Sequence, residues 1–245
     1  MSKKYKFIKE TDSTNGLMKE LIWTGDLPEG FVVRTDFQTR GKGQGTNKWE
    51  SAKGKNLLFS ILLKPVHVPV EEQFLISQII SLAIADSLRR LVSPDDDGFS
   101  IKWPNDIYWQ NKKVGGILIE NTWQGRKIAS SVIGIGLNVN QKQFVSEAPN
   151  PVSLFQIFGR RFRRKALFKA VLSSIEAYYS DPDKDKIRKQ YHQSLFRKNG
   201  FFLFRSGKLN FEAEVVEVAN DGRLILRERN GKISGYYFKE VEFVL

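Results

Sequence analysis

The residues best suited to chemistry lie between positions 102 and 117. The segment Lys102-Trp103-Pro104-Asn105-Asp106 is followed by Lys112-Lys113-Val114-Gly115-Gly116-Ile117. The pattern predicts one turn and two strands, which would bring an amide, a carboxylate, a lysine and two glycines close together. Such a group suits chemistry on anions, for example a carboxylate or a phosphate. Because strand side chains alternate, one of Lys112 and Lys113 can face a site while the other meets solvent.

Two further glycine-rich segments flank this region. The loop Thr39–Trp49 carries alternating glycines at Gly41, Gly43 and Gly45, which let backbone N–H groups approach an anion. It lacks the ending of a Walker A loop, and no helix follows it as in a dinucleotide fingerprint. Downstream, Gly134, Gly136 and Asn138 alternate along an expected strand and would form a floor for a flat ligand. Taken singly, the loop could be a flexible surface loop and the strand a helix-packing face, but the three motifs together favour a ligand site.

Composition excludes several classes of protein. The 245 residues contain no cysteine, which excludes a disulfide scaffold, a thiolate metal site and a cysteine nucleophile. No metal-ligand spacing and no Ser-His-Asp arrangement is present. No signal region or bilayer-length apolar run is found, so we expect a soluble cytoplasmic protein without a membrane partner. The net charge of +12 indicates an acidic partner or simply a solvated basic surface.

The hydrophobic pattern predicts an α+β chain with two domains. We expect strands at residues 5–9, 31–37, 57–64, 99–103, 106–109, 113–121 and 127–138. We expect a helix that begins near residues 12–15, then helices at 70–92, 152–158, 165–179 and 184–195, with a solvated turn at 94–98. From residue 196 the pattern changes to short strands separated by turns such as Asp221-Gly222 and Asn230-Gly231, which is typical of a small barrel.

Together these segments resemble the biotin protein ligases, also called biotin–[acetyl-CoA-carboxylase] ligases. The resemblance rests on Asp12-Ser13-Thr14-Asn15, Gln38 to Trp49, Lys102 to Asp106, Lys113 to Ile117, and Gly134 to Asn138. It implies a mixed sheet flanked by helices, related to the catalytic cores of class II aminoacyl-tRNA synthetases and lipoate ligases, with a small C-terminal SH3-like β-barrel. Residues 1–195 would form the biotin- and ATP-binding catalytic domain, and residues 196–245 the barrel.

The resemblance also implies a reaction in two steps. Biotin and ATP, with Mg²⁺, would give biotinyl-5′-AMP and pyrophosphate. The biotinyl group would then pass to a lysine of a biotin carboxyl carrier protein, as part of acetyl-CoA carboxylase or another biotin-dependent carboxylase.

Roles for individual residues follow from the same resemblance. Lys113 would act as an electrostatic catalyst between the biotin carboxylate and the α-phosphate, and Asp106 would bind Mg²⁺ or accept the proton of the incoming lysine. The implied biotin-binding residues are Ser13, Thr14, Asn15, Gln38, Gly41, Lys42, Gly43, Gln44, Gly116, Gly134 and Gly136. The implied ATP-binding residues are Lys42, Gln44, Asn47, Trp49, Asn105, Lys113 and Asn138, and the implied Mg²⁺ ligands are Asp106 and Asn138. The loop 41–49 would close over the adenylate and exclude water.

Two departures from the family pattern lead to hypotheses. The family loop carries arginines where this chain has Lys42, Gln44 and Asn47, and these residues do not reproduce a bidentate guanidinium–phosphate contact. We therefore expect weaker retention of the adenylate unless other cations, such as Arg40, Lys48, Lys53 and Lys55, compensate. The Ser-Thr-Asn motif begins at residue 13, which leaves no room for an N-terminal DNA-binding domain. We expect the short form of the ligase and no sequence-specific DNA binding.

Two other functions remain open at this stage. A lipoate-protein ligase or a related acyltransferase on the same fold would share the acyl-transfer chemistry and a similar lysine. A non-enzymatic nucleic-acid-binding protein would explain the positive charge. It would not explain the clustered glycines together with Asp106 and Lys113.

Overall fold

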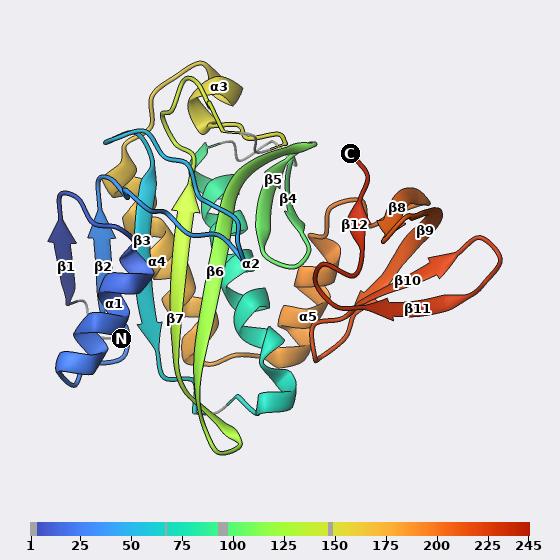
Figure 1. Ribbon diagram of the computed structural model, residues 1–245, viewed down its shortest axis with the longest axis horizontal. Helices are drawn as coiled ribbons and strands as arrows, with labels where there is room; N and C mark the ends of the chain where they lie inside the picture. The colour runs from blue at the N-terminus through green and yellow to red at the C-terminus, as the bar shows by residue number, and fades with distance from the viewer. Residues whose placement is uncertain (1–3, 67, 93–97, 147–148) are drawn as a thin grey trace.

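The main body of the protein is a seven-stranded mixed sheet (Figure 1). The computed structural model describes residues 4–66, 68–92, 98–146 and 149–245. The strand order is β1-β2-β3-β7-β6-β5-β4, and β1 pairs with β2 in parallel while the other neighbours are antiparallel. The strands are β1 (Tyr5–Ile8), β2 (Val32–Thr35), β3 (Leu57–Leu63), β4 (Phe99–Lys102), β5 (Asp106–Trp109), β6 (Lys112–Gln124) and β7 (Lys127–Leu137). The predicted mixed sheet is confirmed.

Helices cover the two faces of this sheet unequally. The helix α1 (Thr14–Thr24) lies on the face toward the viewer in Figure 1, and the larger helices lie behind the sheet. These are α2 (Phe74–Val92), α4 (Arg164–Ser180) and α5 (Lys184–Gln193); a short helix α3 (Leu154–Phe158) precedes α4. Most residues of α2 are buried because it packs between the sheet and its helical neighbours. The front face is therefore left to α1 and to the loops that form the site.

The predicted boundaries agree with the structure with small differences. The helix expected from residue 70 begins as a 3-10 turn, Val70–Glu72, and α2 follows from Phe74. The strand β6 runs further than expected, to Gln124, and forms one long hairpin with β7 around Gly125, whose φ is +59°. The strand β7 ends at Leu137, one residue before the predicted end. Most of the turn expected at residues 94–98 lies outside the described residues.

The C-terminal segment forms a second, five-stranded antiparallel sheet. Its order is β11-β10-β9-β8-β12, built from β8 (Phe202–Ser206), β9 (Leu209–Val218), β10 (Leu224–Glu228), β11 (Ile233–Tyr236) and β12 (Glu242–Phe243). A small C-terminal β domain is thus confirmed, while its SH3-like barrel form stays a prediction. The expected boundary after residue 195 falls between α5 and β8 and also stays a prediction.

The C-terminal domain contacts the main body through the turn at Gly222. The indole N–H of Trp103 donates to the Gly222 carbonyl at 2.9 Å. Gly222 has a φ of +91°, and a Cβ there would lie 2.8 Å from the Phe74 ring. Only glycine fits this close approach without strain. Within the described residues, we find no helix with the length and apolar character needed to cross a membrane.

Candidate active site

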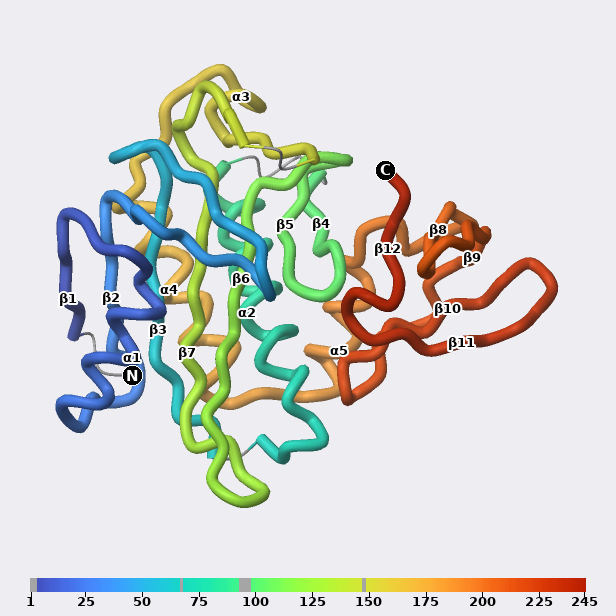
Figure 2. Tube along the Cα trace, viewed as in Figure 1, coloured from blue at the N-terminus to red at the C-terminus, as the bar shows by residue number. Residues whose placement is uncertain are grey.

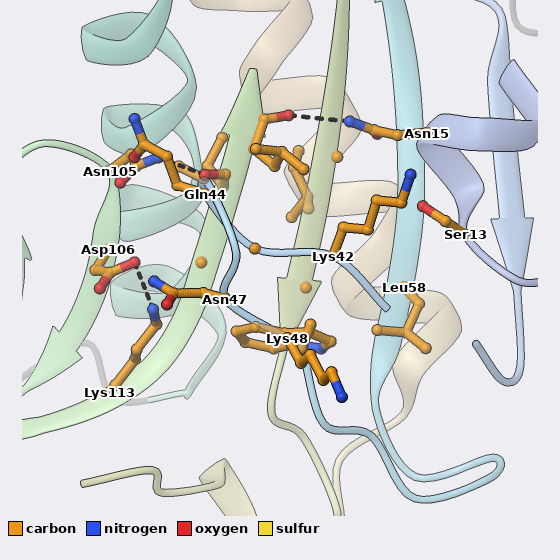
Figure 3. Close-up of a pocket in the computed structure, with 18 of the residues that line it drawn as sticks. Ser13, Asn15, Lys42, Gln44, Asn47, Lys48, Leu58, Asn105, Asp106 and Lys113 are labelled. Atoms are coloured by element: carbon orange, nitrogen blue, oxygen red, sulfur yellow. Dashed lines mark hydrogen bonds and ion pairs between the residues drawn. The ribbon is translucent and has the colours of Figure 1, made fainter. Parts of the chain in front are cut away.

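A cavity of about 150 Å³ lies where the three sequence motifs meet (Figure 3). The glycine-rich loop comes from the β2–β3 connection and crosses in front of β7 and β6 (Figure 2). The turn after β4 and the start of β6 supply one wall, and the start of α1 supplies another. Its lining includes the predicted residues Ser13, Thr14, Asn15, Gln38, Lys42, Gly43, Gln44, Asn47, Trp49, Asn105, Asp106, Lys113, Gly116, Gly134 and Gly136. The structure therefore brings together residues that lie more than a hundred positions apart in the chain.

One end of the cavity holds the Lys113–Asp106 ion pair. The Lys113 ammonium lies 2.7 Å from Asp106 Oδ1, and both side chains are less than a third exposed. The Lys113 Nζ is 5.8 Å from the centroid of the Trp49 ring. Its neighbour Lys112 is exposed, as strand alternation predicts. Lys113 is thus the lysine that faces the site, beside the end of the glycine-rich loop.

The glycines of β6 and β7 line the cavity, and side chains of the protein lie close above them, so a ligand resting on these glycines stays a prediction. A Cβ at Gly136 would lie 2.5 Å from the Trp49 ring, and one at Gly134 would lie 2.5 Å from Asn15 Oδ1. A Cβ at Gly116 would lie 3.1 Å from Trp49. These glycines make room for Asn15 and Trp49, which in turn line the cavity.

The glycine-rich loop folds as a narrow hairpin over this floor. Lys42 and Lys48 form an antiparallel bridge, Gly43 donates to Asn47 at 2.8 Å, and Trp49 donates to Gly41 at 3.0 Å. In the described part of the chain, the buried Gln44 Oε1 and Trp49 Nε1 atoms have no hydrogen-bond partner. Buried polar atoms of this kind need a partner, which a bound molecule can provide.

The opposite end of the cavity is polar and rests on the start of α1. Ser13 occupies the N-cap position but accepts no capping hydrogen bond. Gln38 Oε1 accepts from the Thr14 backbone N–H at 2.8 Å and from the Thr14 hydroxyl at 3.0 Å. In Figure 3 the Lys42 side chain points toward this end, near Ser13 and Asn15. The predicted head-group residues are therefore held together as one polar cluster.

Sequence reasoning missed two residues that support this cluster. Ser60 Oγ lies 2.7 Å from Thr14 Oγ1 and 2.6 Å from Asn15 Oδ1. The Asn15 side-chain amide donates to Glu120 Oε2 at 2.7 Å. Ser60 is a single hydroxyl in the otherwise apolar strand β3, and that isolated polar residue was the available signal. Glu120 has no comparable signal because it lies in the more exposed half of β6.

A third missed residue is Lys102, at the end of β4. It lines the cavity, and its Nζ lies 5.3 Å from the Tyr108 ring centroid and 5.6 Å from that of Phe243. Burial lowers the pKa of Lys102, and the nearby positive charge of Lys113 lowers it further, although the Asp106 carboxylate opposes the shift. The site therefore concentrates positive charge beyond that of Lys113.

Two predicted site residues lie outside the cavity lining. Asn138 is 2% exposed, and its side chain bonds Asn56 and the Lys113 carbonyl at 3.5 and 3.4 Å. Gly41 instead holds the base of the hairpin through Trp49. The predicted contacts of Asn138 with ATP and Mg²⁺ thus gain no support from its position, because it lies just after β7, where strand alternation no longer applies.

The side chains give only partial support for a bound Mg²⁺. Among the described residues, no group of three or more His, Cys, Asp or Glu side chains converges on one point. Asp106 can offer a single carboxylate, which matches the way Mg²⁺ is often held by one carboxylate, water and substrate phosphates. Asp106 fits such a role, and Asn138 does not.

Comparison with known proteins agrees with this geometry. Residues 7–138 match the biotin/lipoate A/B protein ligase family. The chain belongs to this family. The matched residues contain the glycine-rich loop, both ends of the cavity and the glycine floor. The family membership thus rests on the same segments that form the site.

Relatives with similar sequences include two bacterial proteins. The bifunctional ligase/repressor BirA of Bacillus subtilis is 32% identical over 172 residues, covering 69% of this chain and 51% of BirA. The biotin–[acetyl-CoA-carboxylase] ligase of Mycobacterium tuberculosis is 28% identical over 172 residues, covering 69% of this chain and 62% of the relative. The chain spans about half the length of BirA.

A solved ligase matches the whole chain. The biotin protein ligase of Aquifex aeolicus in complex with biotin and ATP superposes with a TM-score of 0.81 at 25% identity, over 99% of this chain and 100% of that one. The overlap includes the C-terminal β domain, so both parts of the ligase fold are shared.

Proposed function

We propose that this chain is a biotin–protein ligase that activates biotin with ATP and transfers it to a lysine of a biotin carboxyl carrier protein. The supporting observation is the position of Lys113. Its ammonium faces the cavity, pairs with Asp106 at 2.7 Å and lies beside Trp49 at the end of the glycine-rich loop. An amine in bulk water, remote from that loop, would have argued against this function.

The charge distribution suits the first step. The carboxylate oxygen of biotin attacks the α-phosphorus of ATP, the bond to the β-phosphate breaks, and pyrophosphate leaves. Two anions must approach each other for this, and a fixed ammonium at Lys113 offsets their repulsion and stabilises the charge that develops on phosphorus. We assign Asp106 the role of holding this ammonium in place, and of offering a carboxylate to Mg²⁺ bound with the phosphates.

The second step needs an amine nucleophile. The neutral acceptor lysine attacks the acyl carbon of biotinyl-5′-AMP, and AMP leaves as the amide forms. We assign Asp106 a further role in this step, in which it takes the amine proton when Lys113 moves onto the phosphate. The polar cluster around Ser13, Thr14 and Gln38 would meet the ureido head of biotin, and the hairpin 41–49 would shield the mixed anhydride from water.

Replacing Lys113 by alanine tests this assignment. We expect the biotin-dependent exchange of pyrophosphate into ATP to fall by about 10²- to 10³-fold, the cost of losing one preorganised charge at a transition state. Lys112→Ala is the matched control, because Lys112 is the adjacent exposed lysine, and it should change the rate less than about twofold. A streptavidin blot of a carrier domain incubated with biotin and MgATP measures the complete reaction.

The outcomes separate the competing functions. Exchange that depends on lipoate and not on biotin would favour the lipoate-ligase alternative. A Lys113→Ala protein that folds and is as active as the unchanged chain would refute the catalytic role. The Mycobacterium tuberculosis relative and the Aquifex aeolicus ligase are both named for biotin, which favours biotin as the substrate. The absence of sequence-specific DNA binding and a cytoplasmic location stay predictions.

A further inference from the structure

The C-terminal domain reaches the tip of the glycine-rich loop through Lys239. This residue lies between β11 and β12, in a segment that turns back toward the main sheet (Figure 2). A Cβ added to Gly45 would lie 2.7 Å from Lys239 Nζ and 3.4 Å from its Cε. The ammonium thus occupies the space that a side chain at Gly45 would fill, and the two domains meet at this point.

The backbone around Lys239 is unusual and well held. Lys239 has a φ of +72°, a left-handed conformation that residues other than glycine rarely adopt. The turn is closed by a bridge between Phe238 and Val241 and by a hydrogen bond from Glu240 N to Tyr237 O at 3.0 Å. Strained backbone that the surrounding structure holds in place is found more often at functional sites. Here it directs a lysine onto the loop.

The charge of Lys239 has no counter-ion in the part of the chain that the structure describes. Five other basic residues of the same domain have a carboxylate partner, in the ion pairs Arg205–Glu242, Arg223–Asp221, Arg227–Glu214, Arg229–Glu212 and Lys232–Glu228. Lys239 forms no such pair with a described carboxylate. Its charge therefore remains available for an anion from outside the chain.

Lys239 lies beside the part of the glycine-rich loop that has no cation of its own. Lys42 and Lys48 lie on the two sides of the hairpin, but residues 43–47 at its tip carry no cation. Phe238, next to Lys239, lines the main cavity, and so does Gln44, next to Gly45. Both also line an adjoining cavity of about 230 Å³ between the two domains. Lys239 itself lines neither cavity, but its chain neighbour Phe238 lines both.

We propose that Lys239 supplies the cation missing from the tip of the glycine-rich loop and binds the polyphosphate of the nucleotide substrate. The C-terminal domain then completes the nucleotide site. This inference rests on the proposed function for its choice of ATP as the ligand. It differs from the role of Lys113, because Lys239 contributes to nucleotide binding and not to the approach of the two reacting groups.

Direct nucleotide binding tests the proposal without depending on catalysis. The full-length protein is titrated calorimetrically with the non-hydrolysable analogue α,β-methylene-ATP, in the presence of Mg²⁺. We expect Lys239→Ala to weaken binding about fivefold, because an exposed charge-assisted contact is lost. Lys239→Arg should stay within about twofold of the unchanged protein, since it keeps the charge. Affinity for biotin alone should be unaffected in all variants.

Lys208→Ala is the matched control. Lys208 is also exposed, lies between β8 and β9 of the same domain, and has no ion pair to a described carboxylate. It should bind the analogue like the unchanged protein. The difference between Lys239→Ala and Lys208→Ala should shrink at high salt, because screening weakens contacts between exposed charges.

Each result has a distinct meaning. If Lys239→Ala binds the analogue as tightly as Lys208→Ala, or if no variant binds it, the proposal is overturned. A loss confined to the affinity for the carrier protein would also overturn it, because the charge would then serve the acceptor. If nucleotide binding depends on Lys239 but pyrophosphate exchange never depends on biotin, the proposed function fails and the nucleotide contact stands.

Discussion

The substitution Gly136→Ala tests whether the glycine floor sets the position of the loop. The added Cβ would lie 2.5 Å from Trp49 Cε2, 2.7 Å from Cζ2 and 2.8 Å from Nε1. Ordinary contact between such atoms is about 3.5 Å, so the indole must move by about 1 Å. Gly136 is not among the glycines with a positive φ. Alanine therefore adds no backbone strain, and the effect is steric.

The indole has little space in which to move. The other edge of the indole approaches Gly116, where an added Cβ would lie 3.1 Å from the ring. The backbone N–H of Trp49 donates to the Gly41 carbonyl at the base of the hairpin. Overpacking of this kind typically costs about 1–3 kcal/mol of folding free energy. A displacement of about 1 Å in a substrate-positioning element can lower the rate by about 10²-fold. We expect kcat/KM for biotin-dependent pyrophosphate exchange to fall about 10- to 100-fold.

Pyrophosphate-exchange kinetics measure the loss of kcat/KM, and urea denaturation measures the loss of folding free energy. The same substitution in a Trp49 variant tests whether the clash with Trp49 causes both losses. Gly25→Ala is the control, since its backbone is extended and no heavy atom lies within 4 Å of the added Cβ. In a Trp49→Phe background the ring is smaller and the clashing atoms Cζ2 and Nε1 are absent, so the stability cost of Gly136→Ala should become smaller. An equal cost in both backgrounds would refute the reasoning, because the clash would then not involve Trp49.

Two further substitutions test the charges of the site. Gln44→Arg should restore a bidentate phosphate contact at the loop and slow the dissociation of biotinyl-AMP, measured by stopped-flow fluorescence; no slowing would count against weak retention in the natural loop. Lys102→Met should stabilise the protein at neutral pH, because burial lowers the pKa of Lys102 and the folded chain holds its proton less readily than the unfolded chain. Between that lowered pKa and the ordinary 10.5, the unfolded state binds more protons, so the stability of the natural protein rises with pH. The advantage of the variant in urea denaturation should therefore shrink from pH 7 toward pH 10, and an advantage that grows with pH would contradict the argument.

Much of the site could be predicted because its residues follow local rules. Strand alternation separates Lys113 from Lys112, and the same rule places Gly134 and Gly136 on one face. The rule was extended too far at Asn138. The strand β7 ends at Leu137, and the Asn138 N–H bonds the Val114 carbonyl, which turns its side chain to Asn56. Alternation therefore predicts direction only while the strand continues.

The polar cluster around Asn15 could not be predicted because it depends on pairing between distant segments. Ser60 and Glu120 meet Asn15 only when β3, β7 and β6 are arranged in that order. The strands β3, which carries Ser60, and β6, which carries Glu120, are separated by β7. Gly134 of β7 leaves the space for the Asn15 side chain. A glycine that the sequence indicated as room for a ligand thus serves first to admit a protein side chain. Only the three-dimensional order of the strands distinguishes these uses.

The contacts of the C-terminal domain with the glycine-rich loop could not be predicted either, because they also depend on pairing between distant segments. Nothing in the spacing of Phe238 and Lys239 resembles a binding motif, and the short strands around them predict only turns. The docking of this domain includes the Trp103 bond to Gly222 and the close contact of Gly222 with Phe74, and the Trp103 ring also packs against Phe238. Once that contact is made, the β11–β12 segment lies against the loop, and Lys239 approaches Gly45 at its tip. Trp103 thus lines the cavity and also joins the second domain to the main body beside the glycine-rich loop.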